Sequence, residues 1–231
     1  MLFKTAESIA ATNVWTTMNQ QDKELLSRLW PRYFPKDKFW GDDKRIGAVE
    51  MFIAFFQSES GKELVPANIT CDVLSVEIDI PSMQRALPFS DFVSMLQTRP
   101  KEVIGCIGIA LSIIFAVTVP AQKSLTCIPR FVGLTTELSF GELKSGTVGQ
   151  LVAIRGYVVR ASHCRPLIEG ALFSCGKCFV DTFTYFEDGI FQPPPICPTK
   201  KCYNKFLDIQ RSTVISTDCQ RVKLQVIKSV V

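Results

Sequence analysis

Four of the nine cysteines lie in two close pairs whose spacing indicates a metal site. Two residues separate Cys175 from Cys178, four separate Cys197 from Cys202, and eighteen lie between the pairs. A short turn of this kind places two thiolates on one side of a loop, each about 2.3 Å from a shared Zn²⁺. Four sulfurs complete a tetrahedron and leave no open position for a reacting water. The spacing therefore predicts a structural zinc ion held by Cys175, Cys178, Cys197 and Cys202.

Two other chemistries fit close cysteine pairs: two disulfide bonds, or one thioredoxin-like redox pair. In the N-terminal segment MLFKTAESIAATNVW, Lys4 and Glu7 interrupt the apolar run that a signal peptide needs. We therefore expect a reducing compartment, where close cysteine pairs bind metal more often than they form disulfides. An odd number of cysteines also disfavours a complete disulfide framework. The remaining cysteines are expected to be buried thiols: Cys71, Cys106, Cys127, Cys164 and Cys219.

The segment that carries the four cysteines, about residues 173–206, is too short for a hydrophobic core of its own, so a bound metal has to supply stability. A strand is predicted before it at residues 151–160, and Gly156 indicates a bend that lets one strand serve two sheets. After the segment, residues 206–225 read as two short strands joined at Ser216–Cys219. Gly176 is expected to provide the turn between the first two cysteines.

Helical patterns dominate the earlier part of the chain. Apolar residues recur at helical spacing in residues 22–30, 44–58 and 88–97, and residues 73–80 favour an extended segment. Asp22 and Ser90 are predicted N-caps, Pro31 is predicted to break the first helix, and the sequence ESGK is predicted to stop the second. Helices first and strands afterwards predict an α+β protein with two modules. We assign residues 1–21 to a weakly ordered N-terminus, 22–122 to a helical subdomain and 123–231 to the strand-rich module.

Residues 103–122 form an uncharged stretch of twenty residues, long enough for a helix to cross the hydrocarbon core of a membrane. Pro100 and Glu102 fit the start of a helix. The stretch contains two glycines and a proline and lacks an aromatic belt and a strong basic flank, which favours a buried helix ending near Val117.

The charge pattern permits a polyanionic partner. The net charge is +4, and basic residues interleaved with aromatic ones crowd the strand-rich part of the chain. Basic and aromatic side chains on a small barrel can bind single-stranded nucleic acid, although a solvated basic face has the same composition. The chain has one histidine, His163, and nothing near it resembles a nucleophile site, so an independent enzyme is disfavoured.

The run VGQLVAIRGYVVRASHCRPL, followed in order by FSCGKC, CPTKKC and STVISTDCQRVKLQ, resembles the N-terminal region of the minichromosome maintenance (MCM) DNA helicases. The stretch RPKEVIGCIGIAL is similar to the end of the helical subdomain of that family. The resemblance covers about residues 85–228, and the wider second cysteine pair is most similar to the eighth paralogue. It implies a helical bundle followed by an incomplete OB-fold β-barrel with an inserted four-cysteine zinc ribbon.

The resemblance also implies a function. It implies zinc bound by the four cysteines, sequence-independent contact with DNA, assembly with other MCM subunits in a hexameric ring, a nuclear location, and a role in replication or in recombination and break repair. It makes the buried-helix reading of residues 103–122 stronger and implies no membrane contact. The candidate DNA contacts are basic residues on or beside the strands: Arg155, Arg160, Lys177, Arg211, Arg221 and Lys223.

Two departures from the family limit this expectation. No G-x-x-x-x-G-K-[ST] phosphate loop occurs in the 231 residues, so ATP is expected to bind only in a C-terminal module outside them. The sequence stops where the family continues through further OB strands, so we expect a truncated product. Two alternatives stay open: a zinc ribbon that mediates only protein–protein contacts, and a membrane-anchored zinc protein that uses residues 103–122 as its span.

Overall fold

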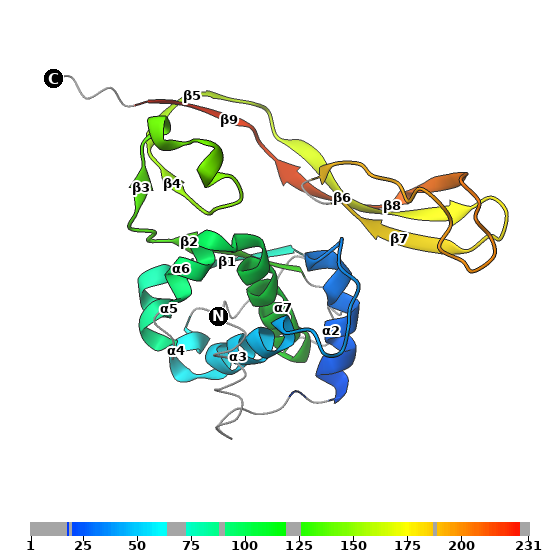
Figure 1. The fold of residues 1–231 in the computed structure, drawn as a ribbon, viewed down its shortest axis with the longest axis horizontal. Helices are drawn as coiled ribbons and strands as arrows, with labels where there is room; N and C mark the ends of the chain where they lie inside the picture. Colours follow the sequence, from blue (N-terminus) through cyan, green and yellow to red (C-terminus); the bar gives the residue numbers. More distant parts are fainter. Residues whose placement is uncertain are drawn as a thin grey trace. The chain divides into compact units, whose positions relative to one another are not determined.

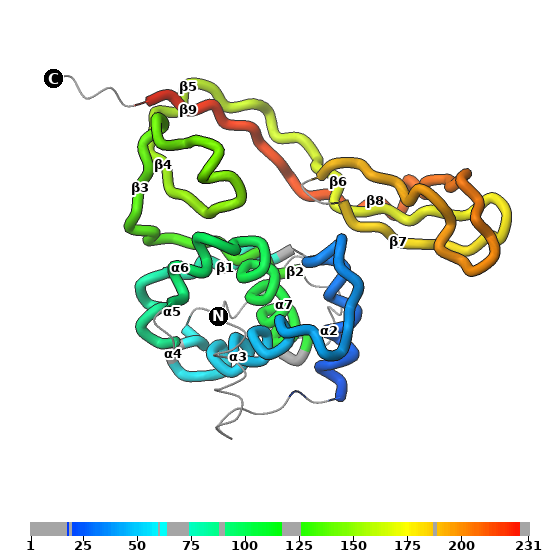
Figure 2. Tube along the Cα trace, in the orientation of Figure 1, coloured from blue at the N-terminus to red at the C-terminus, as the bar shows by residue number. Residues whose placement is uncertain are grey.

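The computed structural model describes residue 18 and residues 20–63, 73–87, 91–118, 126–186 and 189–226. The chain forms two compact units (Figures 1 and 2). The first comprises Met1–Phe34 and Lys38–Arg155, and the second comprises Pro35–Asp37 and Gly156–Val231. This division falls later in the chain than the predicted boundary at residues 122/123. The predicted boundary follows the change from helical to strand pattern, whereas the observed one follows the density of contacts, and the subdomain limits stay a prediction.

The first unit is mainly helical. Its helices are α2 (Gln20–Tyr33), α3 (Arg45–Gln57), α4 (Glu59–Lys62), α5 (Ile80–Ala86), α6 (Phe92–Thr98) and α7 (Pro100–Thr118). Strand β1 (Val73–Asp79) pairs in parallel with β2 (Thr126–Val132), and two short strands follow, β3 (Glu137–Leu138) and β4 (Ala153–Ile154). Between β3 and β4 lie two 3₁₀ turns, Phe140–Glu142 and Ser145–Thr147.

Helix α7 is the centre of the first unit, with α2, α3 and β2 packed around it (Figure 1). Ile107, Ile109, Ala110 and Leu111 have no exposed surface, so α7 is apolar around its circumference because protein surrounds it. The prediction of a buried helix that starts at Pro100 is confirmed. Among the residues that the structure describes, no helix has the length and apolarity needed to cross a membrane.

Several local predictions about the helices need correction. Pro31 lies inside α2, two residues before its end at Tyr33, and Asp22 lies in the first turn rather than at the N-cap. Trp30, the residue before Pro31, is fully buried. Its packing keeps the last turn of α2 helical although Pro31 has no N–H to donate. The sequence ESGK forms the short helix α4 after a break at Ser58, whose side chain accepts a hydrogen bond from the Gly61 N–H. Ser90 lies outside the described residues.

The second unit consists of strands. Strand β5 (Gly156–Ala161) pairs antiparallel with β9 (Val222–Val226), and β6 (Arg165–Cys175) lies between β7 (Asp181–Tyr185) and β8 (Leu207–Cys219). The core between these strands is small: Ala171, Phe173 and Phe186 are buried, with a few partly buried aliphatic side chains around them. Phe173 is therefore part of this core and not one of the exposed aromatic residues of the strand-rich part.

The strand predictions hold with two changes. The predicted strand 151–160 is interrupted at Arg155, so that β4 pairs with β3 and β5 pairs with β9, as the bend at Gly156 suggested. The predicted join at Ser216–Cys219 is wrong: β8 continues to Cys219 because Ser216, Thr217 and Asp218 stay paired with β6, and the turn lies at residues 220–221. The α+β class is confirmed, but within the described residues no sheet closes into a barrel.

Candidate metal centre and nucleic-acid interface

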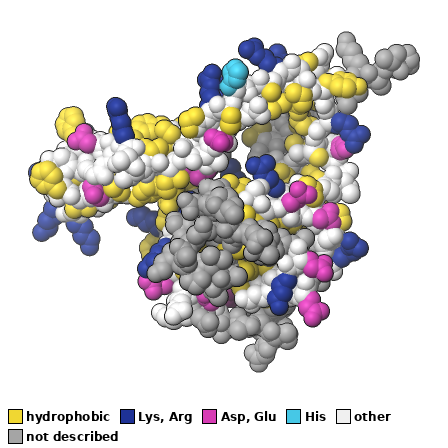
Figure 3. All heavy atoms as spheres, turned by 180° about the vertical axis from the view of Figure 1, so that it is seen from behind, with side chains coloured by type: hydrophobic (Ala, Val, Ile, Leu, Met, Phe, Trp, Pro, Cys, Tyr) yellow, Lys and Arg dark blue, Asp and Glu magenta, His cyan; other side chains and the backbone are white. Residues whose placement is uncertain are grey.

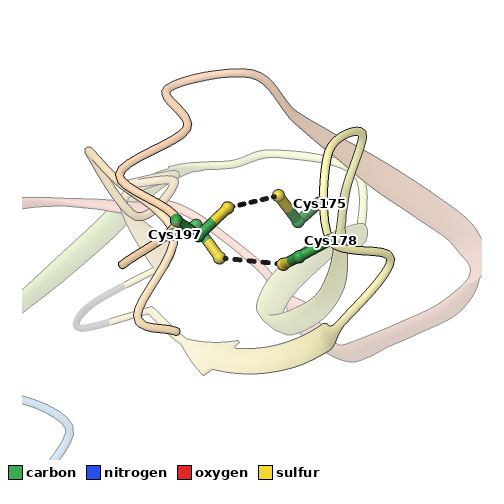
Figure 4. Close-up of side chains that lie close together, drawn as sticks. Cys175, Cys178 and Cys197 are labelled. Atoms are coloured by element: carbon green, nitrogen blue, oxygen red, sulfur yellow. Dashed lines mark hydrogen bonds between the residues drawn. The ribbon is translucent and has the colours of Figure 1, made fainter. Parts of the chain in front are cut away.

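The four predicted cysteines come together at one end of the β6–β8 sheet. Their sulfur atoms all lie within 4.8 Å of one another. Cys175 Sγ lies 3.7 Å from Cys202 Sγ, and Cys178 Sγ lies 3.6 Å from Cys197 Sγ, so each close pair joins one cysteine from each half of the motif (Figure 4). The side chains point toward one another across the space between the two loops.

The first loop is held by the end of β6. Cys175 is the last residue of that strand, and its N–H donates to the Val180 carbonyl at 3.1 Å. The Phe179 N–H donates to the Cys175 carbonyl at 2.9 Å and closes the turn. The Lys177 N–H points to Cys175 Sγ at 3.5 Å. The strand therefore delivers the first thiol, and the turn brings Cys178 beside it.

The second loop follows the same plan. The Cys197 N–H donates to the Asn204 carbonyl at 2.8 Å, and the Cys202 N–H donates to the Thr199 carbonyl at 3.1 Å. The left-handed backbone conformation occurs at Phe179 (φ 55°), Lys201 (φ 72°) and Tyr203 (φ 50°). Gly176 lies in the turn between the first two cysteines, as predicted, but it has no positive φ, so its conformation does not require glycine.

Two polar side chains that the sequence reading missed contact the sulfurs. The Asn204 amide donates to Cys175 Sγ at 3.4 Å, and the Thr199 hydroxyl lies 3.3 Å from Cys197 Sγ and 3.7 Å from Cys178 Sγ. The hydrogen bond from the Asn204 amide stabilises the Cys175 thiolate and orients it, whereas the Cys197 and Cys178 thiols donate to the Thr199 oxygen. Thr199 lies within the second cysteine pair and Asn204 lies two residues after it. Polar side chains so close to the cysteines could have been predicted to bond to the sulfurs.

We call the four clustered cysteines, Cys175, Cys178, Cys197 and Cys202, the cysteine cage. Its electrostatics favour a thiolate at some positions and oppose one at others. The Cys178 backbone N–H and the Asn204 amide lower the pKa of Cys175 to about 6, and the Val180 backbone N–H lowers the pKa of Cys178. The Asn204 backbone N–H also lowers the pKa of Cys202, but desolvation and the neighbouring sulfurs raise it more, to about 11. The neighbouring sulfurs therefore oppose a thiolate at Cys202, and a cation among the four sulfurs would favour one.

The arrangement fits a tetrahedral zinc ion. Four sulfurs at about 2.3 Å from one ion are about 3.8 Å from each other, close to the 3.6 and 3.7 Å separations of the two close pairs. These separations are too long for disulfide bonds, and all four cysteines are free thiols. A thioredoxin-like reaction would use one pair alone, whereas here both pairs face one another. All four sulfurs face one site, so an ion bound there would have four protein ligands and no position left for a substrate.

The other cysteines are less uniform than predicted. Cys106 and Cys127 are buried, as expected, but Cys164 is exposed and Cys219 is partly exposed. Cys219 is the last residue of β8 and lies opposite Arg165, the first residue of β6, which is exposed. Its position at the end of the paired strands explains its partial exposure. Cys71 lies outside the described residues.

The structure spreads the predicted DNA contacts over four places. Arg160 and Lys223 are directly opposite each other on β5 and β9, and Arg221 lies in the turn before β9, where its backbone bonds to Ser162. Arg211 lies where the register between β6 and β8 shifts, and Lys177 lies in the first cysteine loop. Arg155, which precedes β5, is paired with Glu137 at 2.6 Å.

The surface near the cysteine loops is both basic and apolar. Figure 3 shows lysine or arginine side chains beside hydrophobic ones at the outer end of the β6–β8 sheet. Phe179, Tyr203 and Phe206 are among the most exposed large hydrophobic residues in the described part of the chain. His163 is exposed between β5 and β6.

Comparison with known proteins matches the second part of the chain to one family and most of the chain to particular relatives. Residues 139–231 match the MCM OB domain. The chain is 27% identical over 208 residues to a probable DNA helicase MCM8 of Oryza sativa subsp. indica, and 25% identical over 239 residues to the DNA helicase MCM8 of Xenopus laevis. These alignments cover 88% and 92% of the chain, but 26% and 28% of the relatives, so the chain spans about a quarter of their length.

The similarity extends to another member of the family over a shorter stretch. A DNA replication licensing factor MCM7 of Oryza sativa subsp. indica is 31% identical over 96 residues, which is 39% of this chain and 13% of that protein. Residues 139–231 are therefore similar to an MCM OB domain, and most of the chain is similar to about a quarter of the length of proteins named DNA helicase MCM8.

Proposed function

We propose that this chain is the DNA-engaging and ring-assembly region of an MCM-type helicase, built around a structural zinc ion. The match of residues 139–231 to the MCM OB domain carries the proposal. Zinc would be held by Cys175, Cys178, Cys197 and Cys202, and it would supply stability rather than chemistry. ATP would bind outside these 231 residues. The proposal includes a nuclear role in replication, recombination or break repair, with other MCM subunits as partners. Of these, replication is supported by the name of the relative DNA replication licensing factor MCM7.

The pair formed by Arg160 and Lys223 supports DNA contact. Like charges directly opposite on neighbouring strands repel each other, and both side chains are exposed. A phosphate backbone would relieve this repulsion, because one anion can lie between the two cations. Arg221 adds a third positive charge beside β9. Arg155 is the weakest of the six candidates because its guanidinium already has a carboxylate partner.

This contact would be independent of base sequence, so its affinity should depend on salt. Fluorescence anisotropy with a labelled 20-nucleotide DNA, over 50 to 200 mM salt, measures the slope of log affinity against log salt. Arg160→Gln and Lys223→Gln are each expected to weaken binding to any sequence and to reduce the slope by about one. Lys62→Gln removes the same charge from exposed α4 and is expected to change neither. Absence of DNA binding at 50 mM salt, or equal effects of all three changes, would refute the proposal.

A further inference from the structure

Two exposed aromatic residues occupy matching places around the cysteine cage. Phe179 follows Cys178 and Tyr203 follows Cys202, so each comes directly after the second cysteine of its loop. Both have a left-handed backbone, with φ of 55° and 50°, and their exposed fractions are 83% and 72%. The repetition of residue class, conformation and exposure in two loops that differ in length and sequence requires an explanation.

The backbone conformation has a structural reason, but the side chains do not. A left-handed residue after the cysteine turns the next backbone N–H, that of Val180 or Asn204, toward the cysteine sulfur. Glycine or asparagine adopts this conformation with less strain than a bulky aromatic residue. Because the rings are exposed, they add no packing to offset that strain. Strain retained in favour of a particular side chain indicates that the side chain has a function of its own.

The charges around the two rings indicate the class of ligand. The segments 175–180 and 196–206 contain no acidic residue, and their lysines are all exposed. A third exposed aromatic, Phe206, follows in the second loop. We call the set the knuckle surface: Phe179, Tyr203, Phe206, Lys177, Lys200, Lys201 and Lys205. Its charge complements a polyanion, and its rings offer flat apolar faces.

We propose that the knuckle surface binds unpaired nucleotides of single-stranded DNA, with Phe179 and Tyr203 stacking on bases and the lysines contacting phosphates. A duplex would satisfy the lysines but would leave the rings in water, because its bases are already stacked. Single strands satisfy both, since every base presents a free π face and the backbone carries the charge. The proposal rests on the DNA-engaging role given above and specifies where in the chain, and in which state, DNA is held.

The test separates stacking from phosphate contact by changing the ligand. Affinities of the zinc-loaded 231-residue chain are measured for a labelled 20-nucleotide oligo-dT and for an abasic strand of equal length and charge. The chain is expected to prefer oligo-dT. Phe179→Asn and Tyr203→Asn are each expected to weaken oligo-dT binding by about five- to 100-fold and to leave abasic binding unchanged. Phe179→Trp should keep oligo-dT binding, because it keeps an aromatic ring. Lys200→Gln should weaken the binding of oligo-dT and of the abasic strand to the same extent.

Stability measurements guard against a folding artefact. Asparagine tolerates the left-handed conformation, so both asparagine variants should keep the cobalt spectrum of the cage and melt no lower than the parent chain. Lower affinity with equal or higher stability is expected only if the rings serve binding.

Three results would overturn the inference, and they differ in what else they remove. Equal binding of oligo-dT and the abasic strand, or unchanged oligo-dT binding in both asparagine variants, removes the stacking site but leaves DNA contact by Arg160 and Lys223 intact. Unchanged DNA binding with loss of self-association in sedimentation assigns the rings to a protein partner instead. No binding of either strand removes the proposed function together with this inference.

Discussion

At the residue scale, the hydroxyl of Tyr33 joins three elements of the first unit. It lies 2.7 Å from the Ser112 hydroxyl on α7, donates to the Cys127 carbonyl on β2 at 2.9 Å, and accepts from the Cys127 N–H at 2.9 Å. Burial raises the pKa of Tyr33 well above its ordinary value of 10, so the group stays protonated as a donor. Removing it would take this donor from the Cys127 carbonyl and would leave the Cys127 N–H with the longer bond to the Ser112 hydroxyl, at 3.3 Å.

Tyr33→Phe is therefore expected to lower the free energy of unfolding by about 1–3 kcal/mol. Tyr157→Phe is the control, because Tyr157 is exposed on β5 and removing its hydroxyl removes no buried hydrogen bond. Urea titration followed by circular dichroism at 222 nm reports the first unit, because the described α-helices all lie there, so it should shift for Tyr33→Phe and stay unchanged for Tyr157→Phe in the second unit. Equal stability of the two variants would contradict the role given to this hydroxyl.

At the scale of elements, two glycines explain how α7 packs. A Cβ at Gly108 would lie 2.4 Å from the Tyr33 ring and 3.0 Å from the Cys127 carbonyl oxygen, and a Cβ at Gly105 would lie 2.6 Å from the Phe34 ring. These glycines let the aromatic side chains at the end of α2 lie directly against the α7 backbone. They are needed for close approach rather than for backbone flexibility.

The sign of one substitution distinguishes packing from helix propensity. Alanine is the better helix former by about 1 kcal/mol, so propensity alone predicts that Gly108→Ala stabilises the protein. The close contacts predict the opposite, a loss of about 1–3 kcal/mol from overpacking. Gly41→Ala is the control, since nothing lies within 4 Å of its added Cβ. A rise in thermal stability for Gly108→Ala would show that the packing described here is wrong.

Element types were largely predictable from the sequence, whereas pairing partners and element ends were not. The apolar spacing that predicted α2, α3 and α6 and the uncharged stretch that predicted α7 reflect burial, which a single segment already encodes. The partner of β1 is β2, about fifty residues later, and no local pattern specifies that pairing. Pro31 was misread for the same reason, because the packing of Trp30 decides whether the last turn of α2 forms. The turn after β8 depends likewise on how far β6 extends opposite it.

The candidate site shows the same division. Spacing alone predicted which four cysteines come together, because thiolate turns leave a clear sequence pattern. The contributions of Thr199 and Asn204, and the left-handed Phe179 and Tyr203, depend on backbone geometry within the loops. The sequence also does not show which basic side chains form ion pairs. Arg155 is a weak candidate for DNA contact because it pairs with Glu137, which lies on β3.

At the scale of the whole molecule, the two units use different means of stabilisation. The first has a large apolar core that includes Trp30, Phe52 and Phe92, whereas the described residues of the second bury only Ala171, Phe173 and Phe186 as a cluster. So small a core does not stabilise a long sheet whose outer strands are half exposed. Metal binding at the cage, worth on the order of 10 kcal/mol, would close this deficit and fix β6 to β8. The DNA-facing role proposed for the second unit thus depends on the ion.

The most direct test of this account is the metal itself. The purified chain is expected to contain about one zinc per molecule and, after exchange with Co²⁺, to show the thiolate charge-transfer absorption and intense d–d bands of a tetrahedral four-sulfur site. Cys178→Ser should abolish or strongly weaken these bands, whereas Cys164→Ser, which changes an exposed thiol outside the cage, should leave them intact. Zinc content near zero with no charge-transfer absorption would contradict the account.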